Sequence, residues 1–397
     1  MLIPRQAAPV LERLAAGYPL VAITGPRQSG KTTLAREVFG AKSYVSLEDL
    51  DERSFAEADP RGFLGRFGDG AVLDEVQRCP ALFSYLQTRV DEDRRNGLFI
   101  LTGSQQFGLL SSVTQTLAGR IAVVPLLPFS LGELQGAELA PATLEALLFQ
   151  GLYPPIYDRG LDAAIWYKNY VLTYVERDVR QMVNVRDLST FQQFVRMCAA
   201  RTAQLLNLSG LAVDCGITHN TAASWLSVLE ASFILHRVQP YHVNFGKRLV
   251  KTPELYFHDT GLAAWLLGIQ NPDQLAIHPQ RGALFETWVI AELLKARFSR
   301  GLGSNLYFWR DRSGHEVDVL LEQGPTLTPV EIKSGRTVAS DFFSGIDDWR
   351  RISGQADTAA WLVYGGDREE NRGRTRVLPW RRIGELAGGV EPHASAT

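Results

Sequence analysis

One short stretch near the N-terminus constrains the fold more than any other part of the chain. Residues 21–33 read Val-Ala-Ile-Thr-Gly-Pro-Arg-Gln-Ser-Gly-Lys-Thr-Thr, which is an apolar run, a glycine-bounded loop and the start of an amphipathic helix. The loop matches the pattern Gly-x-x-x-x-Gly-Lys-Ser/Thr, which predicts a buried strand, an anion-binding loop and a helix in that order. A chance glycine turn is the alternative, and the flanking apolar run and helix argue against it.

The residue types of this loop fit the binding of phosphates. Gly30 lets the backbone approach an anion without a Cβ clash, and the amides at the start of the helix point toward that anion. Lys31 can reach the β- and γ-phosphates, and the hydroxyl of Thr32 can bind Mg²⁺. The expected phosphate-binding residues are Gly25, Pro26, Arg27, Gln28, Ser29, Gly30, Lys31, Thr32 and Thr33.

Composition sets wide limits on the rest of the chain. Its 397 residues suffice for about two to four domains, because single cores stop growing near 250–300 residues. The balance of 41 basic against 43 acidic residues excludes a uniformly basic nucleic-acid binder but leaves room for local basic patches. The three cysteines are far apart and predict neither zinc nor a disulfide framework. Without an apolar leader or a long apolar run, we expect a cytoplasmic protein with no membrane span.

A second landmark is the apolar run at residues 71–73, which ends in Asp74 and Glu75. Ligands of parallel sheets bind at the carboxyl ends of the strands, which is where both carboxylates would lie. Asp74 could then hold Mg²⁺ together with Thr32, and Glu75 could polarise the attacking water. A solvated acidic turn is the alternative, and the pairing with the phosphate loop favours the functional interpretation.

Two later stretches supply further candidates. The strand expected at residues 98–101 is followed by Thr102 and Ser104, either of which could contact a γ-phosphate or the water. A simple strand-to-turn transition explains these residues equally well. Arg120 precedes the strand expected at residues 121–125 and could bring positive charge to a phosphate of its own chain or of a neighbouring subunit. A surface ion pair is the equal alternative.

These motifs resemble known ones. Residues 25–32, 73–75 and 101–104 look like the Walker A, Walker B and sensor-1 motifs of AAA+ ATPases, and residues 117–134 are similar to bacterial and archaeal ATPases that carry a domain called DUF4143. The resemblance covers nearly the whole chain. It implies an α/β fold with an AAA+ P-loop core at residues 1–135, ATP and Mg²⁺ as cofactors, and a homo-oligomer, with a hexamer favoured because such relatives place active sites between subunits.

The middle of the chain is predicted to be helical. A lid is expected at residues 136–185, where the amphipathic stretch 162–183 contains Arg177. Arg177 could sense the nucleotide or pair with Asp178 or Asp187, and the ion pair is preferred.

A winged helix-turn-helix is expected at residues 186–250. The sequence predicts two helices around a turn at Gly216, the second helix capped at Thr218, with wing strands at residues 234–238 and 249–251. The second helix exposes no Lys or Arg, although phosphate contacts normally dominate affinity for DNA. The basic residues lie in the wing, at Lys247, Arg248 and Lys251. DNA contact and packing between subunits are equally open interpretations.

Residues 251–397 carry a separate constellation. Strands expected at 315–321 and 329–334 alternate so that charged side chains share a face, and a helix at 282–294 lies beside them. The residues expected to come together are Glu286, Asp318, Glu331 and Lys333. The set looks like the PD-(D/E)XK nuclease superfamily, which implies Mg²⁺ at the carboxylates and a water positioned by the lysine. A surface of outward charges and an inactive, nucleic-acid-binding nuclease fold are the alternatives.

The arginine-rich tail after residue 367 could follow a phosphate backbone, or it could be a solvated surface. Taken together, the sequence predicts a P-loop AAA+ ATP hydrolase that acts on DNA as a ring-forming motor, either a translocase or helicase-like. Two alternatives remain at this level. One is a nucleotide-switched module that binds DNA or protein, and the other is an ATP-regulated, metal-dependent nuclease.

Overall fold

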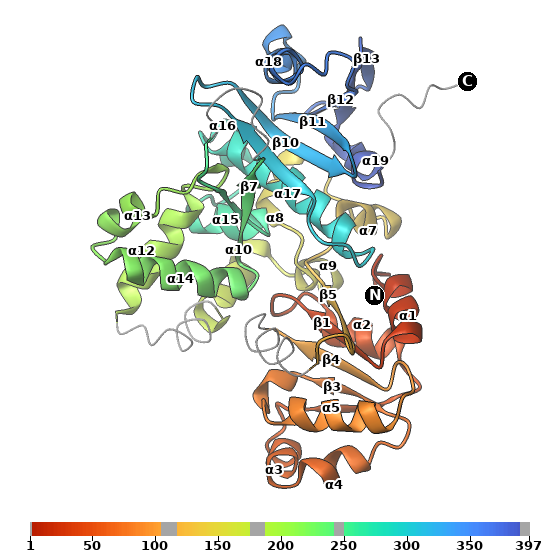
Figure 1. The fold of residues 1–397 in the computed structure, drawn as a ribbon. Helices are drawn as coiled ribbons and strands as arrows, with labels where there is room; N and C mark the ends of the chain where they lie inside the picture. The colour runs from red at the N-terminus through yellow and green to blue at the C-terminus, as the bar shows by residue number, and fades with distance from the viewer. Residues whose placement is uncertain (1, 105–116, 175–186, 242–249, 390–397) are drawn as a thin grey trace.

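The computed structural model describes residues 2–104, 117–174, 187–241 and 250–389. Arg177, Lys247 and Arg248, which the sequence analysis singled out, lie outside these residues. Figure 1 shows an N-terminal α/β layer, a group of helices on one side, and a second, larger sheet at the far end of the molecule.

The N-terminal layer is built on a five-stranded sheet in the order β2-β3-β4-β1-β5. All four neighbouring pairs are parallel, which confirms the parallel core expected from the sequence. The strands are β1 (Leu20–Thr24), β2 (Ser43–Ser46), β3 (Ala71–Asp74), β4 (Phe99–Gly103) and β5 (Ile121–Pro125). The helices are α1 (Ala8–Gly17), α2 (Lys31–Val38), α3 (Leu50–Ala58), α4 (Pro60–Gly65) and α5 (Leu82–Glu92).

Alternating side chains of these strands fill two separate apolar cores. Val21 and Ile23 pack with residues of α1 and α2 on one face, whereas Leu20 and Ala22 pack with residues of α4 and α5 on the other. Because the sheet is covered on both faces, its central strands read as continuous apolar runs. The carboxyl ends of β1, β3 and β4 therefore open together at one edge.

A run of helices follows the core. They are α7 (Leu131–Gly136), α8 (Leu144–Gln150), α9 (Pro154–Asp158), α10 (Ala163–Tyr170), α12 (Leu188–Ala199), α13 (Leu208–Asp214) and α14 (His219–Ala231). The predicted turn between α13 and α14 is present. Gly216 has a positive φ of 64°, and the hydroxyl of Thr218 accepts a hydrogen bond from the amide of Thr221.

The second sheet has nine strands in the order β13-β14-β12-β11-β10-β9-β7-β8-β6. Their bounds are β6 (Gln204–Leu205), β7 (Leu235–Pro240), β8 (Glu254–Phe257), β9 (Leu306–Arg310), β10 (Glu316–Gln323), β11 (Thr326–Lys333), β12 (Ala360–Tyr364), β13 (Glu370–Arg372) and β14 (Thr375–Pro379). The helices around it are α15 (Thr260–Leu266), α16 (Pro272–Ile277), α17 (Arg281–Phe298), α18 (Ser344–Ser353) and α19 (Ile383–Ala387).

This sheet corrects the expected wing. Its β7 strand pairs with β8, and Val250 and Lys251 lie in no strand. The physical reason is burial, because all four residues of β8 are buried whereas Lys251 is exposed. β7 also pairs with β9, so one sheet crosses the domain boundary predicted at residue 250. The division into domains stays a prediction.

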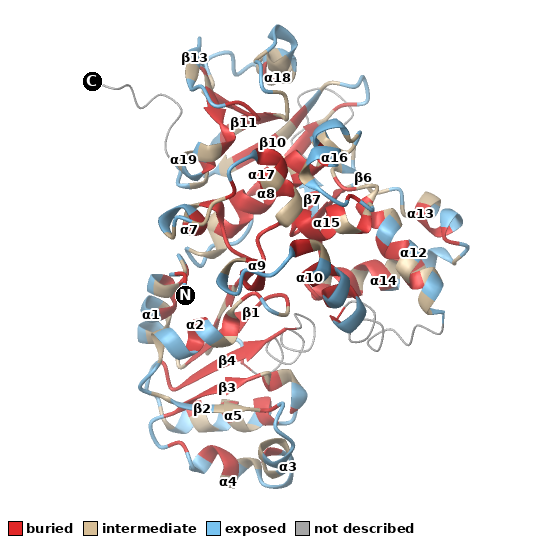
Figure 2. Cartoon of the chain, turned by 180° about the vertical axis from the view of Figure 1, so that it is seen from behind, coloured by how far each residue is buried: buried red, intermediate tan, exposed pale blue. Residues whose placement is uncertain are grey.

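The long helix α17 lies at the centre of this C-terminal body. It is buried along most of its length, from Leu284 to Lys295, and Figure 2 shows it among the largely buried elements beside β10 and α8. In the described part of the chain, no helix has the length and apolar character that crossing a bilayer requires.

Candidate functional site

The phosphate loop runs from the end of β1 to the start of α2, as predicted. Gly25 is required by close packing, since a Cβ there would lie 2.1 Å from the carbonyl oxygen of Leu126. Gly30 caps α2 in the left-handed region with φ of 93°, which favours glycine. The loop therefore presents its backbone at the N-terminal end of a helix, where anions bind.

Lys31 lies inside this loop and is almost fully buried. Its ammonium group donates hydrogen bonds to the carbonyl oxygens of Gly25 at 3.1 Å and Pro26 at 2.8 Å. Burial lowers the pKa of Lys31 to about 8, although the carboxylates of Glu75 and Asp74 oppose the shift. Among the described residues, the hydrogen-bond partners of this buried cation are carbonyl groups, which leaves it well suited to an anionic ligand.

The tips of β3 and β4 meet the loop in one hydrogen-bonded group. The hydroxyl of Thr32 donates to Asp74 at 2.9 Å, and the hydroxyl of Thr102 also donates to Asp74. The hydroxyl of Ser104 donates to Glu75 at 3.0 Å. The structure thus brings together the residues that the sequence placed at three separate strand ends.

Oxygen donors suitable for Mg²⁺ are present at this point. Mg²⁺ is usually held in proteins by one or two carboxylates together with phosphate and water. The hydroxyl of Thr32 and the carboxylate of Asp74, which lie 2.9 Å apart, fit that requirement. A bound Mg²⁺ would offset negative charge on the phosphates.

Two neighbours of this group, Tyr44 and Gln77, were not predicted. The hydroxyl of Tyr44 donates to the second oxygen of Asp74 at 2.8 Å, and burial together with this bond raises the pKa of Tyr44 to about 12. Gln77 contacts both Glu75 and Ser104. No local motif marks Tyr44, but its strand β2 is the neighbour of β3, and that pairing places it there.

A pocket of about 290 Å³ opens at the loop. One wall comes from the loop and from Glu48 and Glu75, and the other from α9 and the residue after it. The second wall consists of Pro154, Pro155, Asp158 and Arg159. The side chain of Trp166 on α10 also reaches the loop and donates to Gln28 at 3.2 Å. Segments that follow the core in sequence therefore complete the rim of the phosphate site.

Arg120 is the one predicted residue of this site that the structure does not bring to the loop. It directly precedes β5, which is parallel to β1, and so lies at the opposite edge of the sheet. Its guanidinium pairs with Asp91 at 2.6 Å on the exposed surface. A contact with a phosphate bound in the same chain is therefore ruled out by position, and a contact with a neighbouring subunit stays a prediction.

The second predicted constellation does assemble, between β10, β11 and α17. Lys333 donates to Glu331 at 2.7 Å and to Asp318 at 3.3 Å, and Asp318 also accepts the amide of Ile332. Burial, followed by the charge of Asp318, raises the pKa of Glu331. Burial alone would lower the pKa of Lys333, but the two carboxylates outweigh it and hold the pKa above its usual value.

Glu286 joins this group through residues that the sequence analysis missed. The hydroxyl of Tyr256 lies 2.6 Å from Glu286 and 2.9 Å from Glu254, both of them carboxylates. Burial raises the pKa of Glu254 to about 7 and raises that of Glu286 as well, with Asp318 adding to both shifts. The alternation Glu254-x-Tyr256 in a strand is the only local signal, since such residues share a face.

Glu331 and Asp318 contact Lys333, and α18 lies against Glu331. A Cβ on Gly345, in the first turn of α18, would lie 1.8 Å from Glu331, so backbone lies directly against that carboxylate. Among the described residues, no three or more His, Cys, Asp or Glu side chains are placed to hold a metal ion. In this structure Asp318 and Glu331 are hydrogen-bonded to Lys333, and the Mg²⁺ that the resemblance implies at this group stays a prediction.

The tail arginines are mostly paired with acids. Arg376 and Arg382 both contact Glu369 and Glu385, and Arg372 contacts Glu370. These contacts favour the solvated-surface interpretation of the tail.

Comparisons with known proteins agree with the geometry of the N-terminal layer. Residues 17–135 match a family described as "AAA domain" (AAA_14). Residues 141–273 and 281–383 match two domains of unknown function, DUF8612 and DUF4143. Two mycobacterial proteins, "Uncharacterized protein Rv2008c" of Mycobacterium tuberculosis and "Uncharacterized protein Mb2031c" of Mycobacterium bovis, are each 32% identical over 349 residues. The alignment covers 85% of this chain and 75% of each relative.

The chain belongs to the family of these mycobacterial proteins. Its AAA domain is a P-loop ATPase-type domain, as the parallel sheet and the phosphate loop show. Among solved structures, the Walker-type ATPase PABY2304 of Pyrococcus abyssi aligns with a TM-score of 0.47 at 17% identity, over 67% of this chain and 96% of that one. AMPPCP-bound DnaA of Aquifex aeolicus aligns with a TM-score of 0.30 at 15% identity, over 56% and 85% respectively.

Proposed function

We propose that this chain binds ATP with Mg²⁺, hydrolyses it, and uses the turnover to act on DNA. The observation that carries the hydrolase proposal is the convergence of Lys31, Thr32 and Asp74 beside an open pocket. Two elements far apart in sequence, α2 and β3, supply the cation, the hydroxyl and the carboxylate that phosphoryl transfer to water requires.

Each of these groups has a separate role in the proposal. Lys31 and the loop amides hold the phosphates, and Thr32 and Asp74 hold Mg²⁺, whose charge stabilises the transferred phosphoryl group. Glu75 orients and polarises the attacking water. Ser104 and Gln77 fix the carboxylate of Glu75 by hydrogen bonds, so its position is set before substrate arrives.

Two substitutions test the hydrolase proposal. Lys31→Ala should abolish ATP binding, and Glu75→Gln should bind ATP but not turn it over. Lys42→Ala serves as the control, because Lys42 is a partly exposed lysine of the same layer whose hydrogen bonds in the described residues go to the carbonyl oxygens of Asp69 and Leu98, before β3 and β4. If both variants hydrolyse ATP at the parental rate, the assignment of the site fails.

We extend the proposal to a homo-oligomer, with a hexamer favoured. Arg120 is exposed and lies at the edge of the sheet away from its own loop. An arginine in that place suits the phosphate site of a neighbouring copy, since a finger supplied from outside can stabilise the transition state. The mass in solution, with and without ATP, tests the assembly.

The action on DNA rests on the middle of the chain. Helices α13 and α14 meet at a tight turn, as in a helix-turn-helix. The lid is proposed at residues 136–185, of which α9 and the residue after it line the phosphate pocket. A winged-helix role is proposed for this unit with β7 and β8 as its strands. Stimulation of ATP turnover by single-stranded, duplex or branched DNA is the expected result. An unchanged rate with all three would favour a nucleotide-switched binding module instead.

The grouping of Asp318, Glu331 and Lys333 favours a second candidate for the C-terminal body, which is a nuclease-like fold that contacts nucleic acid. A cleavage assay with Mg²⁺ or Mn²⁺ decides whether that fold also cuts. Cutting that is lost in Asp318→Ala but kept in Glu316→Ala would establish a nuclease. Glu316 is the matched control because it lies on the same strand and pairs at the surface with Arg310. Absence of cutting would leave a binding module.

A further inference from the structure

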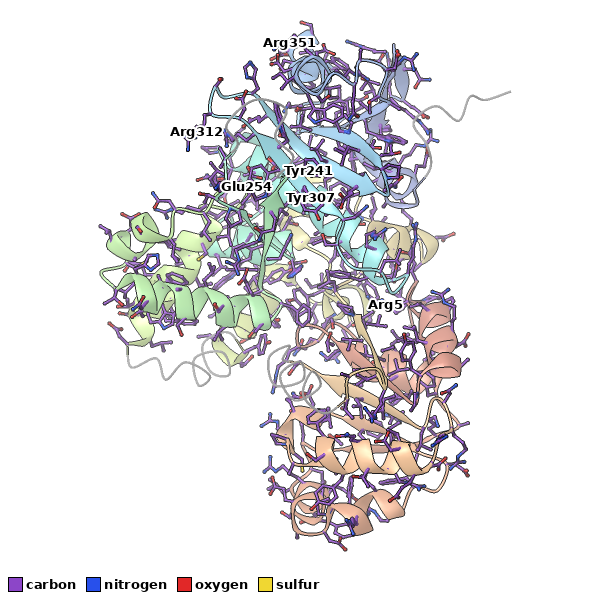
Figure 3. The ribbon with its side chains drawn as sticks, viewed as in Figure 1. Arg5, Tyr241, Glu254, Tyr307, Arg312 and Arg351 are labelled. Carbon is purple, nitrogen blue, oxygen red and sulfur yellow. The ribbon has the colours of Figure 1, made fainter. Side chains whose placement is uncertain are left out.

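A buried arginine outside every motif lies against the phosphate loop. Arg5 precedes the first helix, and its side chain is only 7% exposed. Figure 3 labels it at the junction between the N-terminal layer and the rest of the molecule. Burying a guanidinium group costs folding free energy unless its N–H groups are hydrogen-bonded. The groups that accept from Arg5 therefore indicate what this side chain does in the fold.

The donors of Arg5 reach three different segments. One terminal nitrogen donates to the carbonyl oxygen of Ser29 in the phosphate loop at 2.7 Å, and the other donates to the carbonyl oxygen of Leu127 at 2.7 Å. The Nε atom donates to Glu133 at 3.1 Å. The guanidinium also lies 4.9 Å from the ring centre of Phe129. A single side chain thus connects the loop to the segment that leads out of the AAA domain.

The bond to Ser29 determines how the loop presents its amide. The peptide between Ser29 and Gly30 is planar and trans, so its C=O and N–H point in opposite directions. Because Arg5 draws the Ser29 carbonyl outward, the amide of Gly30 is turned inward, toward the position of the phosphates. The fit is tight, since a Cβ on Gly30 would lie 3.3 Å from the guanidinium.

The other side of Arg5 leads to α17. Glu133 also accepts the amides of Gln6 and Ser130, and the next amide, that of Leu131, donates to Glu292 of α17 at 2.9 Å. Lys295 of α17 donates to Glu292 and to the carbonyl oxygen of Phe129, both at 2.8 Å. Residues 129–133 are therefore held between two buried ion pairs, Arg5–Glu133 and Glu292–Lys295.

We propose that Arg5 is a positioning residue for the nucleotide site: it orients the loop amide at Gly30 and, through Glu133, ties the loop to α17. The proposal rests on the proposed ATP-binding function. A lysine cannot replace the arginine fully, because an ammonium group lacks the planar fork that reaches three acceptors in fixed directions.

Nucleotide affinity measured with fluorescent ATP and ADP analogues tests the first half of the proposal. Arg5→Ala should lower the affinity for both nucleotides by about tenfold to a hundredfold, because a charge-assisted hydrogen bond at the loop is lost. Arg5→Lys should lower the affinity less. Arg13→Ala is the matched control. Arg13 is exposed on α1 and makes one bond, to the carbonyl oxygen of Arg300.

A purely structural role gives a different result. Loss of folded protein would lower the number of binding sites per chain at unchanged Kd, and that outcome would overturn the proposal. If Arg5→Ala fails to fold, Arg5→Lys and Glu133→Gln carry the same test. The proposed ATP function is judged separately, by whether the parent binds and Lys31→Ala does not.

Hydrogen exchange tests the tie to α17. ATP should change the amide protection of residues 129–133 and of α17 in the parent, and this change should be reduced in Arg5→Lys even at saturating nucleotide. Equal responses in the two proteins, or no response in the parent, would overturn this half of the proposal.

Discussion

The phosphate site contains a buried lysine and the carboxylate site a partly buried one, and the pKa values of the two lysines are shifted in opposite directions. Lys31 donates to two carbonyl groups beside an open pocket, and burial lowers its pKa to about 8. Lys333 is paired directly with Glu331 and Asp318, and its pKa is raised. Lys31 lines an open pocket, where an anionic ligand can reach it, whereas Lys333 is already paired with carboxylates of its own chain.

The largest expected effect concerns the acidic group of the phosphate site. Asp74→Asn keeps the size of the side chain but removes the charge that faces Thr32. We expect Mg²⁺-dependent ATP turnover to fall by about a hundredfold to a thousandfold, because several kcal/mol of charge stabilisation are lost. Asp69→Asn is the control, since Asp69 is an exposed acid at the turn before β3. Turnover within a few-fold of the parent would remove Asp74 from the proposed metal site.

The next prediction tests whether α18 packs as closely against Glu331 in solution as it does in this structure. In Gly345→Ala, the new methyl group would meet Glu331 and the backbone oxygen of Glu316, at 1.8 and 2.4 Å from their present positions. Overpacking of this kind costs about 1–3 kcal/mol, so the thermal midpoint should fall.

Gly282→Ala is the matched control for this variant. Gly282 lies in α17, and an added Cβ would meet only the hydroxyl of Ser334, at 3.9 Å. Alanine is favoured over glycine within helices by roughly 1 kcal/mol, so this variant should be neutral or more stable. Equal midpoints for Gly345→Ala and the parent would show that α18 does not close over Glu331 in solution.

A site residue could be predicted where it belongs to a short contiguous motif, and could not where it is brought to the site by contacts between distant parts of the chain. The loop residues, Asp74 and Glu75 come from contiguous motifs at the carboxyl ends of strands of one parallel sheet, and the structure groups them as expected. Tyr44, by contrast, lies at the phosphate site because β2 pairs with β3, and Arg5 lies there because the N-terminal segment packs against the loop. Neither contact can be predicted from the spacing of residues in the sequence.

The carboxylate site shows the same limit. The hairpin of β10 and β11 fixes Asp318 opposite Glu331, which alternation along the strands could predict. Glu254 belongs to β8, which reaches this site only because one sheet continues across the expected domain boundary. The cover by Gly345 depends on the packing of α18, and alternation within strands says nothing about it.

A smaller effect is expected from pH at the phosphate site. Free Lys31 has a lowered pKa of about 8, and a bound phosphate raises it again by charge pairing, so binding favours the protonated form. ATP affinity should therefore be constant below pH 8 and fall about tenfold per pH unit above it, until the pKa of the bound form is reached. Titrations with a fluorescent ATP analogue between pH 7 and 9.5 measure this. A flat profile would mean that Lys31 stays charged without its ligand.

The smallest expected effect in the single chain concerns Arg120. It distinguishes a residue that acts on the nucleotide of its own chain from one that acts on the nucleotide of a neighbouring copy. Arg120 pairs with Asp91 on the surface, at the far edge of the sheet from Lys31. Arg120→Ala should therefore leave ATP affinity unchanged, because nothing at its own loop is altered.

If a neighbouring copy uses this arginine, turnover should be lost only at protein concentrations where the parent assembles, while the assembled mass stays the same. Because any parallel strand starts at the edge opposite its ligand-binding end, residue order alone argues against a contact in the same chain. Parental turnover at every concentration would assign Arg120 to its ion pair, and a loss in the dilute, unassembled protein would contradict the position seen in this fold.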